Sequence, residues 1–315
     1  MNIILSDSNT VTNNDIDMSF LNKFGNVTYK ALIDYEDIAD SIENADIILC
    51  NKTPLNAYTL RKAKSLKYIG LFATGYNNID IEYCKNNNIT VCNAGSYSTD
   101  AVAQQVFAFI LEHYNKTVNY KKFVQDGGWR NCETFSPFVF NTYELRDKTI
   151  GLVGFGNIAK QVAKIATAFN MNVLAYTRST QEFDNVTFTT LDELLSKSDI
   201  ISVHCPLNEQ SENMFNKETF SRCKKGSYFI NTARGGIVVE NDLVTAVKDG
   251  TLSGAGIDVL AVEPMDDDCP LVNVENITVT PHIAWAPLET RKRLMGIVAS
   301  NIEMFLNGTP TNKIV

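Results

Sequence analysis

The sequence predicts an α/β protein with two doubly wound parallel sheets. Short runs rich in β-branched residues alternate with longer segments of helical period, which is the pattern of parallel strands joined by crossover helices. The pattern occurs in two successive series, and 315 residues are enough for two domains of about 150 residues each. A glycine-rich turn between a strand and a helix lies near the start of the second series. We therefore expect two domains of the same class.

The first series begins at the N-terminus. Its candidate strands are Asn2–Leu5, Asp46–Cys50, Lys67–Phe72 and Ile89–Cys92. A helix is expected over Tyr58–Ser65, and apolar residues at helical spacing predict an amphipathic helix from Asp100 to Tyr114, capped by Thr99 or Asp100. The stretch from Lys121 to Asp147 is irregular and too long for an ordinary connection, which is typical of a functional or interface loop.

The second series starts at Lys148. Its candidate strands are Thr149–Val153, Asn172–Tyr176, Asp199–His204, Ser227–Asn231, Gly256–Val259 and Ile277–Thr280. A helix over Lys160–Phe169 follows the glycine-rich turn, and a last helix is predicted over Leu288–Leu306. No short repeat or low-complexity tract interrupts either series.

Composition disfavours several classes of protein. The chain has 28 Lys and Arg against 36 Asp and Glu, a net charge of -8, which disfavours nucleic-acid binding. No apolar run approaches the roughly 20 residues of a membrane helix, and the start does not have the form of a signal peptide. The 7 cysteines are odd in number and form no C-x-x-C pair, so neither a disulfide framework nor a metal site is predicted. We expect a cytoplasmic protein.

The strongest local signal is the segment Gly154-x-Gly156-x-x-Ala159, with an apolar strand before it and a helix after it. The first glycine permits a tight turn, the second lets the backbone approach a pyrophosphate, and the small alanine allows close contact between helix and strand. The N–H groups at Asn157 and Ile158 can bind the anion at the helix start. The pattern predicts dinucleotide binding; the alternative is a tight turn without a ligand.

The end of the next strand bears on which dinucleotide is bound. NAD enzymes usually carry Asp or Glu about 20 residues after the glycines, where the carboxylate accepts a hydrogen bond from the ribose 2′-OH. Here that position is Thr177, and Arg178 follows with the hydroxyls of Ser179 and Thr180. A guanidinium can pair with a 2′-phosphate, whereas a carboxylate would repel it. We expect NADP to be preferred, with NAD possible; Arg178 as a solvated loop residue is the alternative.

The chain has 3 histidines, so few groups can transfer a proton. His113, near the end of a helix, is expected to be structural. His204 ends a strand just before Pro206, where it could contact a nucleotide or be a packed, hydrogen-bonded side chain. His282 follows a strand at its carboxyl end, where open α/β sheets bind their ligands, and it is the best candidate for an acid or base.

Two further strand ends carry charged groups. Arg234 follows the strand that ends at Asn231, and an arginine there can bind a carboxylate or carbonyl through two hydrogen bonds. Asp258 and Glu263 follow the next strand. Each alone could be a solvated residue, but three successive strands bring Arg, Glu and His to one side of a dinucleotide-binding fold.

These residues make the chain resemble the D-isomer-specific 2-hydroxyacid dehydrogenases over essentially its whole length. The matching segments are Gly154-x-Gly156-x-x-Ala159, Asn231-x-Ala233-Arg234-Gly235-Gly236, Gly256-x-Asp258-Val259 with Glu263-Pro264, and Pro281-His282-Ile283-Ala284-Trp285. Within the family the chain is most similar to the glycerate dehydrogenase and hydroxypyruvate reductase branch. The segments that indicate the branch are Ala73–Asp80, Ser98–Gln104, Gly128-Trp129-Arg130 and Trp285.

The resemblance implies a Rossmann cofactor domain, residues 99–286, inserted into a flavodoxin-like substrate domain made of residues 1–98 and 287–315, with the active site in the cleft between them. It implies that His282 donates the proton in reduction, that Glu263 is its partner and that Arg234 anchors the substrate. A carboxylate beside an imidazole favours the protonated ring, and a guanidinium stabilises a developing alkoxide. Backbone N–H groups at Thr74 and Gly75 would bind the substrate carboxylate.

The resemblance also implies further contacts. Lys52 could add a positive charge at the substrate, and Trp285 would line the same site. The residues expected to contact the cofactor are Thr99, Gly154, Gly156, Asn157, Ile158, Thr177, Arg178, Ser179, His204, Pro206, Thr232, Ala233, Arg234, Asp258, His282 and Ala284.

The leading hypothesis is an NADPH-preferring reductase of small 2-oxo acids such as hydroxypyruvate or glyoxylate. A phosphoglycerate or D-lactate type of dehydrogenase is the nearest alternative. A dinucleotide-sensing corepressor of the same fold is an alternative from a different class. The aromatic-rich stretch from Lys121 to Asp147 needs apolar cover, and in the family this region contributes to a dimer interface. A homodimer through the first helix of the cofactor domain and this loop is therefore expected; the alternative is a loop folded back on its own subunit.

Overall fold

The structure is a computed structural model that describes residues 1–179 and 181–315; Thr180 lies outside the described residues. The chain divides into two compact units. One consists of Met1–Ser98 and Ala286–Val315, and the other of Thr99–Trp285. Each unit is built around one parallel sheet, so the predicted α/β class is confirmed.

The sheet of the first unit has 5 parallel strands in the order β2-β1-β3-β4-β5, which is the flavodoxin-like order. Its strands are β1 (Asn2–Leu5), β2 (Asn26–Tyr29), β3 (Ile47–Cys50), β4 (Tyr68–Leu71) and β5 (Thr90–Cys92). Every residue of the central strands β3 and β4 is buried, because helices cover both faces of the sheet. Continuous apolar runs are therefore the signature of these strands.

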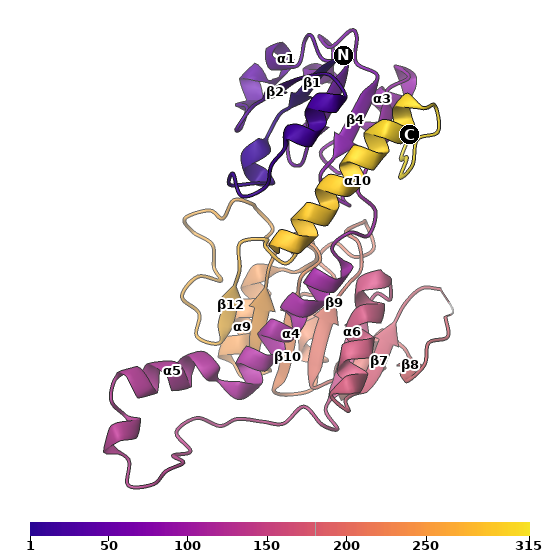
Figure 1. Cartoon of the computed structure of the whole chain (residues 1–315). Coiled ribbons are helices and arrows are strands. Elements are labelled where there is room, and N and C mark those ends of the chain that lie inside the picture. Colours follow the sequence, from indigo (N-terminus) through magenta and orange to yellow (C-terminus); the bar gives the residue numbers. More distant parts are fainter. Residues whose placement is uncertain (180) are drawn as a thin grey trace. The chain divides into compact units, whose positions relative to one another are not determined.

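The α-helices of the first unit are α1 (Ile38–Ser41), α2 (Ala57–Leu60), α3 (Ile81–Asn86) and α10 (Leu288–Leu306). Short 3-10 turns span Ser8–Thr10, Ser19–Lys23 and Tyr35–Asp37. The C-terminal helix α10 packs on β4, where the rings of Phe305 and Tyr68 lie with centroids 4.7 Å apart (Figure 1). The C-terminal helix is thus part of the same compact unit as the N-terminal strands.

The sheet of the second unit has 7 parallel strands in the order β12-β11-β10-β9-β6-β7-β8. This is the Rossmann order of six strands with one more strand at an edge. The strands are β6 (Thr149–Val153), β7 (Asn172–Tyr176), β8 (Val186–Phe188), β9 (Ile200–Val203), β10 (Ser227–Asn231), β11 (Leu252–Ile257) and β12 (Ile277–Val279). The strand β6, which precedes the glycine turn, lies between β7 and β9 near the centre of the sheet.

The second unit also contains α-helices. They are α4 (Thr99–Asn115), α5 (Thr117–Gln125), α6 (Asn157–Ala168), α7 (Leu191–Lys197), α8 (Lys217–Ser221) and α9 (Glu240–Lys248), with 3-10 turns at Trp129–Asn131 and Gly235–Ile237. Helix α4 packs against α6 and β11. Helix α5 and the chain after it project away from the sheet of this unit (Figure 1).

Several sequence predictions were wrong in their bounds. The helix predicted over Tyr58–Ser65 is a single turn, α2, because the chain then turns so that Ala63 and Leu66 enter the core. The stretch predicted to be irregular from Lys121 begins inside α5; because none of the residues of α5 is buried, no side of this helix is marked as facing the core. The strands β2 and β8 were missed for a similar reason, since neither has a buried residue.

None of the helices in the described part of the chain combines the length and apolarity needed to cross a membrane. All seven cysteines carry free thiols, and Cys50, Cys84, Cys92 and Cys223 are buried.

His113 is a structural residue, as the sequence predicts. Its Nε2 lies 3.0 Å from the hydroxyl of Ser253, and its ring stacks on Tyr228 with centroids 4.0 Å apart. Burial, with a smaller contribution from nearby Lys116, lowers the pKa of His113 from 6.5 to about 4. The ring therefore stays neutral in the native protein at a pH where the unfolded chain binds a proton.

This depressed pKa predicts acid destabilisation. Above pH 6.5 the titration of His113 does not change the free energy of unfolding. Between pH 6.5 and about 4 it should lower that free energy by up to about 1.4 kcal/mol for each pH unit of acidification. His113→Gln removes the titrating group and keeps a side chain that can bond to Ser253. We expect the variant to lose stability less steeply on acidification, measured by urea unfolding at pH 7, 6 and 5. Parallel pH curves for the two proteins would contradict the assignment.

Candidate active site

The glycine turn of the second unit is tightly packed at its first glycine. Gly154 directly follows β6 with φ 93°, in the region that favours glycine. A Cβ there would lie 2.7 Å from the carbonyl carbon of His204 and the nitrogen of Cys205. Only glycine lets the chain after β6 pass so close to the chain after β9.

The second glycine faces open space. A Cβ on Gly156 would meet no atom within 4 Å, and the residue is the N-cap of the 12-residue helix α6. The N–H groups of Asn157 and Ile158 in its first turn lie at the positive end of the helix dipole. Backbone donors beside open space fit a pyrophosphate.

Two buried polar atoms support the same reading. Nε2 of His204 and Oγ1 of Thr232, which follow β9 and β10, are buried without a hydrogen-bond partner among the described residues. Buried polar groups normally have partners, so a polar ligand at this edge would account for both. Burial lowers the pKa of His204 to about 3, which makes its ring a neutral group at physiological pH. These residues fit a dinucleotide.

The segment predicted to select the cofactor follows β7. Thr177 is half-buried, while Arg178 and Ser179 are exposed. Nη1 of Arg178 donates to Oε1 of Gln210 at 2.5 Å, and Nε2 of Gln181 donates to the hydroxyl of Ser179 at 3.2 Å. Sequence reasoning missed Gln210, since its link to Arg178 spans 32 residues.

His282 and Glu263 meet at the carboxyl edge of the same sheet. Nδ1 of His282 lies 2.7 Å from Oε2 of Glu263, and Oε1 of the same carboxylate accepts from the N–H of Leu260 at 3.0 Å. An ionised carboxylate only accepts hydrogen bonds, so Nδ1 carries the hydrogen of this pair. Nε2 is then the ring atom that can exchange a proton with a substrate.

The backbone at His282 is in the left-handed region, with φ 52°. Asp258, which is 1% exposed, stabilises this turn. Its carboxylate accepts from the hydroxyl of Thr280 at 2.6 Å and from the N–H groups of Ile283 and Ala284, each at 2.9 Å. Burial raises the pKa of Asp258, and these donors offset only part of that rise. An uncommon backbone conformation held by neighbours is typical of a functional residue.

Arg234 leaves β10 through a short polar turn. The side chain of Asn231 accepts from the N–H of Ala233 at 3.0 Å and donates to the carbonyl of Arg234 at 2.9 Å. Nη1 of Arg234 donates to the carbonyl of Ala233 at 2.7 Å, which uses one of the five guanidinium N–H donors. The half-buried guanidinium is thus held near the backbone of its own turn.

The first unit carries Lys52, Thr74 and Gly75, and each follows a strand of its sheet. Lys52 follows β3 and is exposed. Thr74 follows β4; its hydroxyl donates to the carbonyl of Gly95, and its carbonyl accepts from the side chain of Asn93 at 2.8 Å.

The other predicted residues lie beside these groups along the chain. Thr99 is the first residue of α4, Trp285 follows Ala284, and the carbonyl of Pro206 accepts from the hydroxyl of Ser211 at 2.6 Å. Among the described residues, no group of three or more His, Cys, Asp or Glu is arranged to hold a metal ion.

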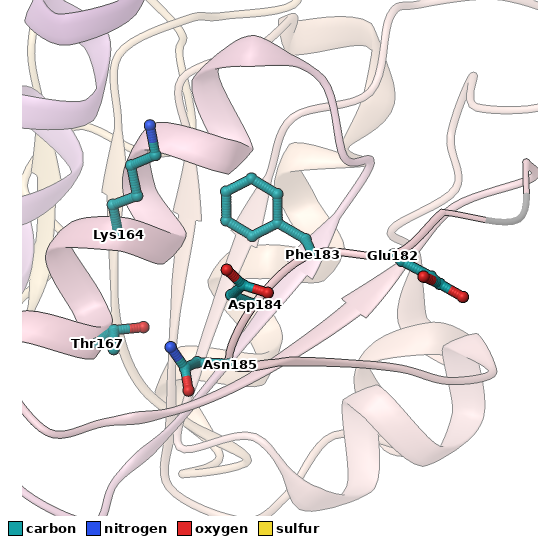
Figure 2. A pocket seen from close by; sticks show the side chains of 6 residues that line it. All are labelled: Lys164, Thr167, Glu182, Phe183, Asp184 and Asn185. Atoms are coloured by element: carbon teal, nitrogen blue, oxygen red, sulfur yellow. The ribbon is translucent and has the colours of Figure 1, made fainter.

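A hollow of 510 Å³ in the second unit lies apart from this set (Figure 2). It lies between α6 and the segment leading to β8, and the residues that line it are Lys164, Thr167, Glu182, Phe183, Asp184 and Asn185. None of them was predicted to be functional, so this hollow and the predicted chemistry do not coincide.

A glycine turn that opens a helix, with a paired imidazole and carboxylate at the same sheet, defines an oxidoreductase that uses a nicotinamide dinucleotide. Residues 107–284 match the family model described as D-isomer specific 2-hydroxyacid dehydrogenase, NAD binding domain. The chain therefore belongs to the D-isomer-specific 2-hydroxyacid dehydrogenase family.

Individual relatives agree with this membership. A hydroxypyruvate reductase of Blautia hydrogenotrophica is 37% identical over 320 residues, which cover 100% of this chain and 99% of the relative. Two solved structures are also similar over nearly all of both chains. An acyclic imino acid reductase in complex with NADPH and D-Arg is 31% identical with a TM-score of 0.88, covering 100% of both chains. A D-lactate dehydrogenase of Aquifex aeolicus complexed with NAD and lactic acid is 27% identical with a TM-score of 0.85, covering 98% of this chain and 96% of that chain.

Proposed function

We propose that this protein reduces small 2-oxo acids, with hydroxypyruvate and glyoxylate as the first candidates, to D-2-hydroxy acids. The observation that carries the proposal is the contact of 2.7 Å between His282 and Glu263 in the unit that also holds the glycine turn. The hydroxypyruvate reductase that matches the whole chain supports this substrate class. In this proposal the unit Thr99–Trp285 binds the dinucleotide and the other unit binds the substrate.

The proposed mechanism assigns one role to each polar group. A bound dinucleotide supplies the hydride for the 2-oxo carbon. Nε2 of His282 donates a proton to the oxygen that becomes the hydroxyl, while Glu263 keeps the ring oriented. Arg234 stabilises the negative charge that develops on that oxygen. Lys52 and the backbone at Thr74 and Gly75 bind the substrate carboxylate.

A substrate panel tests this function. The purified protein is mixed with NADPH or NADH and with hydroxypyruvate, glyoxylate or pyruvate, and absorbance at 340 nm is followed. We expect rapid oxidation of cofactor with hydroxypyruvate or glyoxylate. One similar structure is that of an imino acid reductase in complex with D-Arg. An additional assay therefore mixes the protein with D-arginine and the oxidised cofactor. Dinucleotide binding without turnover of any 2-oxo acid would contradict the proposal.

We further propose that NADPH is preferred to NADH, and Arg178 supports this. The side chain is exposed after β7 and its partner, Gln210, is neutral, so its charge is left for a 2′-phosphate. Arg178→Ala should raise the dissociation constant for NADPH about tenfold or more and leave the dissociation constant for NADH nearly unchanged. Arg222→Ala is the matched control, because that arginine pairs with Asp192 on the surface. Equal losses for both cofactors would contradict the assignment.

We also propose a homodimer formed through the projecting segment after α4. Phe135 and Phe138 are 91% and 92% exposed, and large apolar surface of this kind normally has a partner. Hydrogen bonds of 3.0 Å from Tyr120 to the carbonyl of Phe140 and from Trp129 to the carbonyl of Phe135 order the segment internally. A second copy is the expected occupant, since two-fold dimers are the commonest oligomers.

The dimer has a direct test. We expect a dimer mass by light scattering at micromolar concentration, and a monomer mass after Phe135→Asp with Phe138→Asp. Leu32→Asp is the control, because Leu32 is 66% exposed in the other unit. A monomeric unmodified protein would contradict the proposal. The cytoplasmic location stays a prediction.

A further inference from the structure

A buried carboxylate in the first unit holds the loop that carries Lys52. Asp7, just after β1, is 2% exposed. Its Oδ2 accepts from the N–H of Lys52 at 2.6 Å and from the N–H of Thr53 at 2.8 Å, and its Oδ1 accepts from the N–H of Asn51 at 2.9 Å. Three successive backbone donors after β3 thus converge on one carboxylate from the neighbouring strand β1.

Side chains extend this arrangement. The hydroxyl of Thr53 donates to Asp7 at 2.9 Å and lies 2.7 Å from the hydroxyl of Ser6. The amide of Asn78 donates to the carbonyl of Thr53 at 2.9 Å, and the amide of Asn51 bonds to Thr10. A hydrogen-bond network whose members are all paired holds them in one arrangement.

The middle residue of the loop differs from its two neighbours in burial. Asn51 and Thr53 are 5% and 6% exposed, whereas Lys52 between them is exposed. The ammonium group is therefore presented from a backbone that is anchored on both sides. The charged group of a long, flexible side chain is placed more narrowly when its own backbone cannot move.

We propose that Asp7 is a positioning residue for substrate recognition, acting through the backbone of Asn51–Thr53 to place Lys52 against the carboxylate of the 2-oxo acid. This inference rests on the proposed function. Asp7 itself touches neither substrate nor cofactor, because its oxygens face the loop. Its loss should therefore weaken substrate binding rather than the chemical step.

The test compares four proteins by steady-state kinetics with hydroxypyruvate and NADPH: unmodified, Asp7→Asn, Lys52→Ala and the double variant. Asp7→Asn keeps the volume but loses the charge and an acceptor oxygen. We expect it to raise KM for hydroxypyruvate about tenfold to hundredfold, with kcat and KM for NADPH nearly unchanged. Lys52→Ala should raise KM for hydroxypyruvate in the same way. The double variant should have a KM no higher than that of Lys52→Ala alone.

Asp46→Asn is the matched control. Asp46 precedes β3 at its opposite end, where its carboxylate accepts from the N–H of Asn2 at 2.8 Å, so its loss should leave KM unchanged. If Asp7→Asn does not fold, Thr53→Val removes one donor to Asp7 and should raise KM in the same way by a smaller factor.

Two outcomes would overturn the inference while the unmodified protein reduces hydroxypyruvate. One is an unchanged KM in Asp7→Asn or, where that variant does not fold, in Thr53→Val. The other is a rise in KM on Asp7→Asn that is equally large in the unmodified protein and in the Lys52→Ala variant. A failure of the unmodified protein to reduce any 2-oxo acid would instead overturn the proposed function.

Discussion

His282→Ala is expected to lower kcat by about 10²–10⁴-fold, because the variant has no group to give the substrate oxygen its proton. The 2.7 Å contact with Glu263 orients the ring, and alanine removes both the acid and this contact. The dissociation constant for the dinucleotide should change little, since the glycine turn and the start of α6 are untouched. Stopped-flow reduction of hydroxypyruvate and fluorescence titration of the cofactor measure the two quantities.

His113→Gln is the matched control for this variant. It replaces a histidine of the same unit that bonds to Ser253, and it should keep nearly full kcat. A His282→Ala protein that is folded, binds cofactor and keeps most of its kcat would show that another group is the acid.

Arg234→Lys is expected to lower kcat/KM by about 10²–10³-fold, and Arg234→Ala by at least as much. Lysine keeps the positive charge but lacks the planar fork that binds a carboxylate or carbonyl at two points. The loss should exceed that in Arg222→Ala, which removes a surface arginine of the same unit. An Arg234→Lys protein with unchanged kcat/KM would mean that this guanidinium does not contact the substrate.

The sequence predicts three strands of the second unit residue by residue, whereas the predicted bounds of β9 and β11 differ from the observed ones. The bounds of β6, β7 and β10 agree with the predicted strands. All residues of β10 are buried, so a short apolar run between turn residues is an unambiguous signal there. The edge strands β2 and β8 have no such signal, because their residues lie partly in solvent.

The candidate site divides in the same way. The glycines, Arg234, Glu263 and His282 could be selected from the sequence because each follows a strand within a recognisable local pattern. Asp7 could not be selected from the sequence, because the backbone N–H groups that it accepts from belong to Asn51–Thr53, 44 to 46 residues further along the chain. Gln210 was missed for the same reason. A partner that is close in space and distant in sequence leaves no local pattern to read.

Transfer of deuterium tests the central claim most directly. NADPH deuterated at both C4 positions of the dihydronicotinamide is incubated with the protein and hydroxypyruvate, and the product is analysed by mass spectrometry and chiral chromatography. The account predicts D-glycerate with one deuterium at C2. Product without deuterium, or product of the L configuration, would contradict direct hydride transfer to one face of a 2-oxo acid.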